Sequence, residues 1–259
     1  MLALLSPAKT LDFEPAPAGV PHSQPALLDE TERLLAVARR LGPDDLQQLM
    51  GLSESLAELN FERFQRFSAS RRATRGRKQA MLAFAGDVYM GLSAATLRPK
   101  GLAFAQDHLR ILSGLYGLLR PLDLIEPYRL EMGTALPNER GANLYAFWGD
   151  RIARAILDAL EGHRHPVVVD LASKEYARAA RLPQLGVRVV TPLFKERRGG
   201  ALKVISFSAK RARGAMARFI LDRRIDRPEA LLRFDRDGYA FHEGQSSDDT
   251  WVFVRDPPG

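Results

Sequence analysis

The residues best suited to hold an anion lie in a basic stretch at residues 210–224, KRARGAMARFILDRR. Its apolar residues recur at intervals of three and four, which predicts the buried face of a helix over Ala209–Ile225. Positive charges in the first turns of a helix oppose its dipole, and three cations stand there: Lys210, Arg211 and Arg213. A phosphate bound between them would compensate this repulsion, and so would surface ion pairs with acids such as Asp222.

Other cations stand near the ends of predicted strands. Lys9 follows an apolar run at Leu2–Leu5, and Lys195 follows another at Val187–Thr191. Lys203 lies in the run Leu202–Phe207, which leads directly into the basic helix. If the first and last of these strands are parallel neighbours, their ends open on one edge of the sheet, where α/β proteins bind ligands. We therefore predict one anion site that Lys9 shares with Lys210, Arg211 and Arg213.

Acidic residues accompany these cations and offer proton chemistry. Asp123 and Glu131 share a loop with Arg120, Tyr128 and Arg129, and Glu175 follows Asp170 and Ser173 past the strand Pro166–Ala172. Loops on a rigid scaffold often carry function. If the protein is an enzyme, the catalytic candidates are Lys9, Asp123, Glu131 and Glu175. Ion pairs that order the long loop, and Ser173 capping a helix, would explain the same residues structurally.

Several familiar active sites are absent from the sequence. Ser6-Pro7-Ala8-Lys9 matches the S-x-x-K of serine acylases, but the companion K-T-G is missing and a Pro-rich loop follows instead of a helix. There is no cysteine, and the five histidines lack metal-ligand spacing; His163 and His165 are expected to be solvated. We expect neither a metal nor a cofactor.

The segment Asp44–Asn60, DDLQQLMGLSESLAELN, has the spacing of a helix-hairpin-helix that extends to about residue 67. Such a turn directs backbone N–H groups at a phosphate. Gly51 is expected to need a positive φ. Ser53 stands where this motif commonly has a second glycine, and it is suited to cap the second helix. An ordinary pair of packed helices is the alternative.

These residues must be positioned by a mixed α/β fold, because short continuous apolar runs such as VVVDL are typical of strands covered on both faces. We predict one domain over residues 1–259, a compact mixed sheet with surrounding helices. The 259 residues are 46% hydrophobic and 27% charged, which suffices for a core. No signal peptide or membrane-spanning run is visible, so a cytoplasmic protein without a membrane partner is expected.

Helices and strands of this fold follow from local patterns. Helical spacing predicts helices, and short apolar runs predict strands. The expected helices are Ala26–Leu41, Asp44–Met50, Glu54–Phe67, Pro99–His108, Leu144–Leu160 and one from Ser173; further strands are Arg110–Ser113, Tyr239–His242 and Trp251–Val254. Residues 68–78, SASRRATRGRK, are expected to form a solvated basic loop.

The net charge of +7 and the pI of about 9.9 predict attraction to polyanions. Nucleic acid bound without sequence preference is therefore the expected partner. The charge is equally compatible with simple solubility, so it does not decide the function alone.

Long blocks of the chain resemble the YaaA family of peroxide-stress-resistance proteins. They run nearly from end to end: LLSPAKTLD at 4–12, GDVYMGL at 86–92, LSGLYGLLRPLDLIEPYRLEMGT at 112–134, LYAFWGD at 144–150, LASKEY at 171–176, FKE at 194–196 and KVISFSAKRARGAMARFI at 203–220. The resemblance implies a protein that limits peroxide damage by lowering the iron available for Fenton chemistry. It also implies a single unusual α/β fold, a positively charged cleft and a DNA-binding helix-hairpin-helix.

Two classes of function follow. The first is DNA binding through the hairpin and a basic cleft, with Lys9, Gly51, Ser53, Arg120, Arg129, Lys195, Lys203, Lys210, Arg211 and Arg213 as the contact residues. The second is an enzyme that acts on a phosphate-bearing or purine-like small molecule in the same cleft. Acids gathered in one deep pocket would favour the enzyme, and a wide basic groove would favour the DNA-binding protein.

Overall fold

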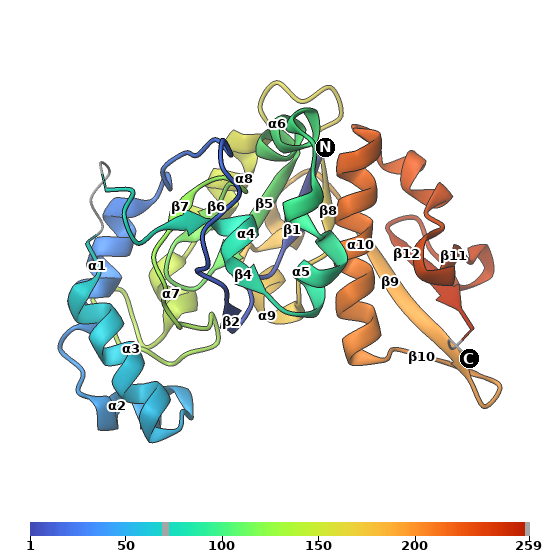
Figure 1. Ribbon diagram of the computed structural model, residues 1–259. Helices are drawn as coiled ribbons and strands as arrows, with labels where there is room; N and C mark the ends of the chain where they lie inside the picture. The colour runs from blue at the N-terminus through green and yellow to red at the C-terminus, as the bar shows by residue number, and fades with distance from the viewer. Residues whose placement is uncertain (69–72, 257–259) are drawn as a thin grey trace.

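The computed structural model describes residues 1–68 and 73–256, and it confirms a mixed α/β architecture. A central mixed sheet runs through the molecule (Figure 1). Its strands lie in the order β11 (Ala240–Phe241), β12 (Thr250–Arg255), β9 (Arg188–Arg198), β8 (Val167–Asp170), β1 (Leu2–Leu5), β5 (Leu109–Ser113) and β6 (Gly117–Leu119), and β10 (Ala201–Lys203) pairs with β9. Two small sheets pair β2 (Thr10–Leu11) with β4 (Phe84–Ala85) and β3 (Lys78–Gln79) with β7 (Leu124–Ile125).

The middle of the main sheet is parallel. β1 pairs in parallel with β5 and β8, and β9 pairs in parallel with β8 and β12. All four residues of β1 are buried, as the continuous apolar run Leu2–Leu5 predicts for a strand covered on both faces. Because these strands are parallel, β1 and β8 end at the same edge of the sheet.

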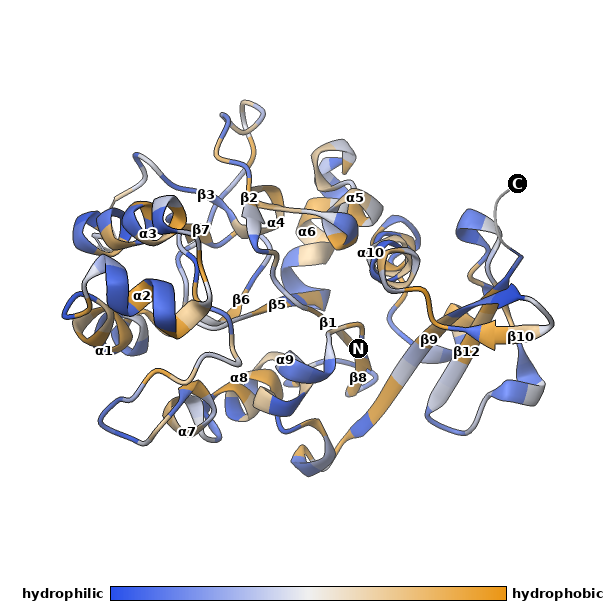
Figure 2. Ribbon diagram, turned by 90° about the horizontal axis from the view of Figure 1, so that it is seen from below, coloured by the Kyte–Doolittle hydropathy of each residue, from blue (hydrophilic) through white to orange (hydrophobic). Residues whose placement is uncertain are grey.

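Ten α-helices lie among the described residues, and Figure 2 shows them on both sides of the sheet. Helices α5, α6 and α10 lie on one side, and α7, α8 and α9 lie on the other. Their bounds are α1 Leu28–Ala38, α2 Pro43–Met50, α3 Glu54–Arg66, α4 Ala80–Ala83, α5 Asp87–Leu92, α6 Pro99–His108, α7 Leu144–Trp148, α8 Arg151–Leu160, α9 Lys174–Ala179 and α10 Ser206–Arg223. No helix in these ranges is long and apolar enough to cross a bilayer.

Three predicted elements differ in the structure. The expected strand Val187–Thr191 runs on to Arg198 as β9, so Lys195 lies within this strand and does not follow it. The expected helix Leu144–Leu160 is two helices, because Gly149 adopts a φ of +54° and ends α7. The expected strand Leu202–Phe207 stops at Lys203, and α10 begins at Ser206. Strand β10 pairs antiparallel with β9 and is not a neighbour of β1. The strand before the basic helix is therefore not the parallel neighbour of Leu2–Leu5 on which the predicted shared site depended.

Helices α5 and α10 touch backbone to backbone. A Cβ atom on Gly214 would lie 1.7 Å from the carbonyl oxygen of Val88, and one on Gly91 would lie 2.1 Å from the carbonyl oxygen of Arg211. Two glycines therefore allow an approach that any side chain would block. This contact fixes α10 against the segment that follows β4.

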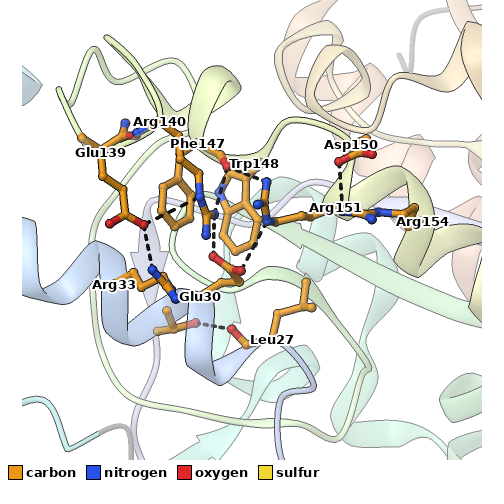
Figure 3. Close-up of polar contacts among 12 residues, drawn as sticks. Leu27, Glu30, Arg33, Glu139, Arg140, Phe147, Trp148, Asp150, Arg151 and Arg154 are labelled. Atoms are coloured by element: carbon orange, nitrogen blue, oxygen red, sulfur yellow. Dashed lines mark hydrogen bonds and ion pairs between the residues drawn. The ribbon is translucent and has the colours of Figure 1, made fainter.

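A cluster of ion pairs ties α1 to the loop before α7 and to α8 (Figure 3). Glu30 of α1 accepts hydrogen bonds from Arg140 and Arg151, and the guanidinium of Arg140 lies 4.5 Å from the ring centre of Phe147. Burial alone would raise the pKa of Glu30, but the two arginines outweigh it and hold the pKa below its usual range. The carboxylate thus stays charged and joins three segments that are distant in sequence.

Candidate functional site

A cavity of about 370 Å³ opens at the carboxyl ends of β1 and β8. It lies between the loop after β1, the turn into α5, the loop at residues 128–131, the start of α9 and the first half of α10. Its charged and hydroxyl-bearing lining residues are Ser6, Lys9, Thr10, Asp87, Tyr128, Arg129, Glu131, Ser173, Glu175, Tyr176, Lys210 and Arg213. This is the sheet edge at which α/β proteins hold ligands.

An ion-pair chain crosses one wall of the cavity. Lys9 Nζ lies 3.0 Å from Glu131 Oε2, and Arg129 donates to Glu131 Oε1 at 3.3 Å. Lys9 is largely exposed and Glu131 is partly buried. Glu131 therefore aligns two cations from different segments, and both of them border the cavity.

Helix α9 contributes to the cavity lining and is bound to the loop that carries Glu131. Glu175 Oε1 accepts the backbone N–H of Gly133 at 2.8 Å, and Tyr145 donates to the backbone carbonyl of Glu175 at 3.3 Å. The hydroxyl of Tyr128, from the same loop as Arg129, lies 2.6 Å from Ser113 Oγ. Burial raises the pKa of the Tyr128 and Tyr176 hydroxyls, so both stay protonated at neutral pH.

Ser6 and Ser173 join the ends of the two parallel strands. Ser6 Oγ accepts the backbone N–H of Ser173 at 2.8 Å and donates to Ser173 Oγ at 3.3 Å. Lys9 forms an ion pair with Glu131 and not with Ser6. The hydroxyl of Ser6 is thus used to fix the cavity floor, which disfavours a serine nucleophile activated by Lys9.

Arg213 and Asp170 form a half-buried pair of opposite charges beside the cavity. Burial raises the pKa of Asp170 to about 6, while the N–H of Ala172 and the charge of Arg213 partly offset this effect. Burial likewise lowers the pKa of Arg213, and the charge of Asp170 partly restores it. As the pH falls through about 6, protonation of Asp170 removes the negative charge that partly balances Arg213. The positive character of the cavity therefore increases as the pH falls towards 6.

The cavity contains charges of both signs. Four cations line it, Lys9, Arg129, Lys210 and Arg213, together with three acids, Asp87, Glu131 and Glu175. A surface that recognises only phosphates rarely needs acids beside its cations. The mixture suits a compact ligand that has both an anionic group and hydrogen-bond donors.

Two predicted site residues, Asp123 and Arg120, lie outside the cavity. They form the alternative considered for them, an ion pair that orders the loop. Asp123 is 1% exposed, and its carboxylate accepts hydrogen bonds from Ser23 and from the backbone and side chain of Arg120. Arg120 also donates to the carbonyl of Gln24 at 2.9 Å. This network orders the loop, and neither residue lines the cavity.

The predicted cations on β9, β10 and α10 also separate. Arg211 points to Asp237, 3.6 Å away, although its helix neighbours Lys210 and Arg213 line the cavity. Lys195 donates to Gln245 at 3.5 Å, and Lys203 is exposed on β10. Of these cations, only Lys210 and Arg213 line the cavity, whereas Lys195, Lys203 and Arg211 do not.

Glu196, which follows Lys195, is buried in an ion-pair cluster. Its side chain is 1% exposed and lies 2.7 Å from both Arg198 and Arg255. Burial would raise the pKa of this carboxyl, but the Ser208 hydroxyl and the two arginines outweigh this effect and lower the pKa to about 2. Glu196 therefore stabilises the junction of β9 and β12.

The predicted hairpin segment forms α2, a short turn and α3. Gly51 has the expected positive φ of +60°, and Ser53 occupies the N-cap position of α3. The Ser53 hydroxyl makes no capping hydrogen bond and instead lies 3.3 Å from Ser55 Oγ. The segment lies at one end of the molecule (Figure 1). Part of the predicted basic loop, residues 69–72, lies outside the described residues.

Sequence reasoning missed two features of this chain. Asp87 lines the cavity because Gly86, at a φ of +123°, turns the chain into α5. The predicted solvation of His163 is wrong, because its Nδ1 lies 2.8 Å from the amine of Met1 and its ring contacts that of His108. Within residues 1–68 and 73–256, no three His, Asp or Glu side chains are grouped as a metal site requires.

Comparisons with known proteins extend over the whole chain. A family model described as "Peroxide stress protein YaaA" matches residues 1–245. A UPF0246 protein from Caulobacter vibrioides is 51% identical over 258 residues, which is 100% of both chains. UPF0246 proteins from Paraburkholderia phytofirmans and Burkholderia mallei are 49% and 50% identical over 257 residues, 98% of both chains.

Proposed function

The chain belongs to the peroxide stress protein YaaA family, and we propose that it serves in peroxide stress by binding a phosphate-bearing small molecule in the cavity at the ends of β1 and β8. The observation that carries this proposal is the convergence of Lys9, Lys210 and Arg213, from two distant segments, on one cavity. Such convergence of charged groups in a pocket is typical of ligand sites.

The neighbouring acids support a ligand of the nucleotide type. Glu131 and Glu175 can accept hydrogen bonds from ring or sugar groups, while the cations hold the phosphate. The volume of about 370 Å³ lies within the range of small-molecule sites. An enzyme would use the same arrangement, with Glu131 or Glu175 as its proton-transferring group.

We expect Lys210→Gln to weaken binding of a mononucleotide about tenfold, because one charge-assisted contact to phosphate is lost. Lys210 is exposed on α10, so the fold should be unaffected. Titration calorimetry with adenosine 5′-monophosphate measures the affinity, and a thermal melt checks the fold.

The matched control is Lys100→Gln, an exposed lysine on α6 that does not line the cavity. It removes the same charge from the protein as a whole. Equal losses in both variants would mean that only net charge attracts the nucleotide, and the proposed site would be wrong.

DNA binding is the second candidate. It is supported by the net charge of +7 and by the left-handed conformation of Gly51 in the turn between α2 and α3. It ranks second because residues 43–66 contain five acids and only two arginines. A phosphate at this turn would therefore be held by backbone N–H groups and not by side-chain charge.

If the turn contacts DNA, Ser53→Glu should weaken DNA binding several-fold, because it places a carboxylate against the phosphate. The melting temperature should hardly change, since Ser53 is exposed and makes no cap hydrogen bond. Fluorescence anisotropy with a duplex measures binding, with the log affinity falling by about 0.9 per neutralised phosphate against log salt.

Ser247→Glu is the control, because it adds the same charge to an exposed serine just before β12. Strand β12 and the helices α2 and α3 lie at opposite ends of the molecule (Figure 1). Unaltered DNA affinity in Ser53→Glu would assign the two helices to packing alone. Affinity that stays flat as salt increases would argue against DNA binding itself.

A further inference from the structure

Phe207 is the one exposed aromatic ring among the Phe, Tyr and Trp residues that the structure describes, with 63% of its surface accessible. The other phenylalanines, such as Phe219 and Phe253, pack in the core or against it. Val204, three residues earlier, is 57% exposed as well. Apolar surface is thus left in water at the start of α10, where burial would be favourable.

The position of this ring relates it to the cavity. Arg213, Lys210 and Phe207 follow one another at intervals of three residues on α10, so they lie along one side of the helix. Arg213 and Lys210 line the cavity, and Phe207 does not. Exposure increases along this row, from the half-buried Arg213 to the exposed Lys210 and Phe207. The row therefore leads from the cavity wall to its rim.

The spacing along the row fits a molecule with one charged and one flat apolar end. Each step of three residues advances about 4.5 Å along the helix axis. A phosphate held by Lys210 and Arg213 is then about one helical turn from the Phe207 ring. In a nucleotide, the sugar separates phosphate and base by a comparable step, and every base has a flat face that can stack on an aromatic ring.

We infer that Phe207 stacks on the base of a nucleotide whose phosphate is bound by Lys210 and Arg213 in the cavity. This inference rests on the proposed function, and it specifies the ligand as a nucleotide instead of a simple phosphate ester. Because stacking is tolerant of base identity, the site selects for the presence of a base more than for its type. The stacked base belongs either to a free nucleotide or to a nucleotide within a single strand of nucleic acid.

The test compares adenosine 5′-monophosphate with ribose 5-phosphate by titration calorimetry, on the wild type and on Phe207→Ala. The variant should weaken nucleotide binding about tenfold or more and leave ribose 5-phosphate unchanged. Phe207→Trp should retain the nucleotide affinity, and Phe207→Leu should lose it, because leucine keeps apolar area without a flat ring. A thermal melt of each variant checks the fold.

The outcomes separate this inference from the proposed function. If both ligands bind the wild type and Phe207→Ala binds the nucleotide equally well, the stacking role is overturned while the phosphate site stands. If neither ligand binds, the proposed site and the inference fail together. A short single-stranded oligonucleotide, tested on the same variants, shows whether the base comes from a strand: its tighter, Phe207-dependent binding would support a strand as the source.

Discussion

Replacing Glu196 by glutamine is expected to lower the free energy of unfolding by about 3–5 kcal/mol, because it leaves the charge of Arg255, whose side chain is 13% exposed, without its buried partner. The carboxylate is 1% exposed and lies 2.7 Å from the guanidinium groups of Arg198 and Arg255. Arg255 stands directly opposite Glu196 in the parallel pair of β9 and β12, so the loss acts on the sheet itself. The melting temperature should fall by roughly 10 °C.

The matched control is Glu229→Gln. Glu229 also pairs with an arginine, Arg188, at 3.0 Å, but its side chain is 59% exposed. Exposed pairs contribute little, so its stability should change by less than about 1 kcal/mol. Urea denaturation of both variants gives the comparison, and similar small losses would show that burial does not strengthen the Glu196 cluster.

The pH dependence of stability follows from the same carboxylate. Its pKa falls from 4.5 to about 2 on folding. The stabilisation from a lowered carboxyl pKa is complete above the unfolded value and disappears as the pH falls through the folded value. The wild type should therefore lose this contribution between about pH 4.5 and 2, whereas Glu196→Gln should show a shallower decline over that range.

The second large effect is expected for Gly214→Ala, with a loss of about 3 kcal/mol or more. The added Cβ would lie 1.7 Å from the carbonyl oxygen of Val88, which is backbone and cannot rotate away. Helices α5 and α10 must therefore separate. The higher helix propensity of alanine, about 1 kcal/mol, offsets only part of this cost.

This variant should also weaken ligand binding, because Asp87 and Val88 of α5 line the cavity together with Lys210 of α10. Gly101→Ala in α6 is the control: its added Cβ meets only the side chain of Leu97, whose Cδ2 lies 3.3 Å away and can move. Its stability should change by no more than about 1 kcal/mol. A Gly214→Ala variant as stable as the wild type would contradict the backbone contact between α5 and α10.

Sequence patterns predicted those elements whose limits are set locally. Leu2–Leu5 and Pro99–His108 are observed with the predicted bounds, because a short apolar run and a proline at the first helical turn are strong local signals. The predicted ends of an element were wrong where one residue changed the direction of the backbone. Gly149 divides a helical pattern that is otherwise continuous in its apolar spacing.

The candidate site was predicted only in part, because its formation depends on how distant segments meet. Strand β10 does not neighbour β1, yet Lys210 and Lys9 reach one cavity because α10 packs on α5. Local sequence does not show which side of a helix faces a cavity. Arg211 and Arg213 are two residues apart, and only the second lines it. The carboxylate of Asp123 is likewise bound by Ser23, which is 100 residues away in the sequence, as well as by Arg120 of its own loop.

The ends of the main sheet bear on how copies of this protein behave at high concentration. Among the described residues, the terminal strands β6 and β11 are three and two residues long. Such short edges offer few unpaired backbone groups, and long flat edges are what promote strand addition and fibril formation. The long strand β9, with eleven residues, is enclosed by β8, β12 and β10. Crowding in the cell therefore gives this sheet little opportunity to recruit a second chain into amyloid-like aggregates.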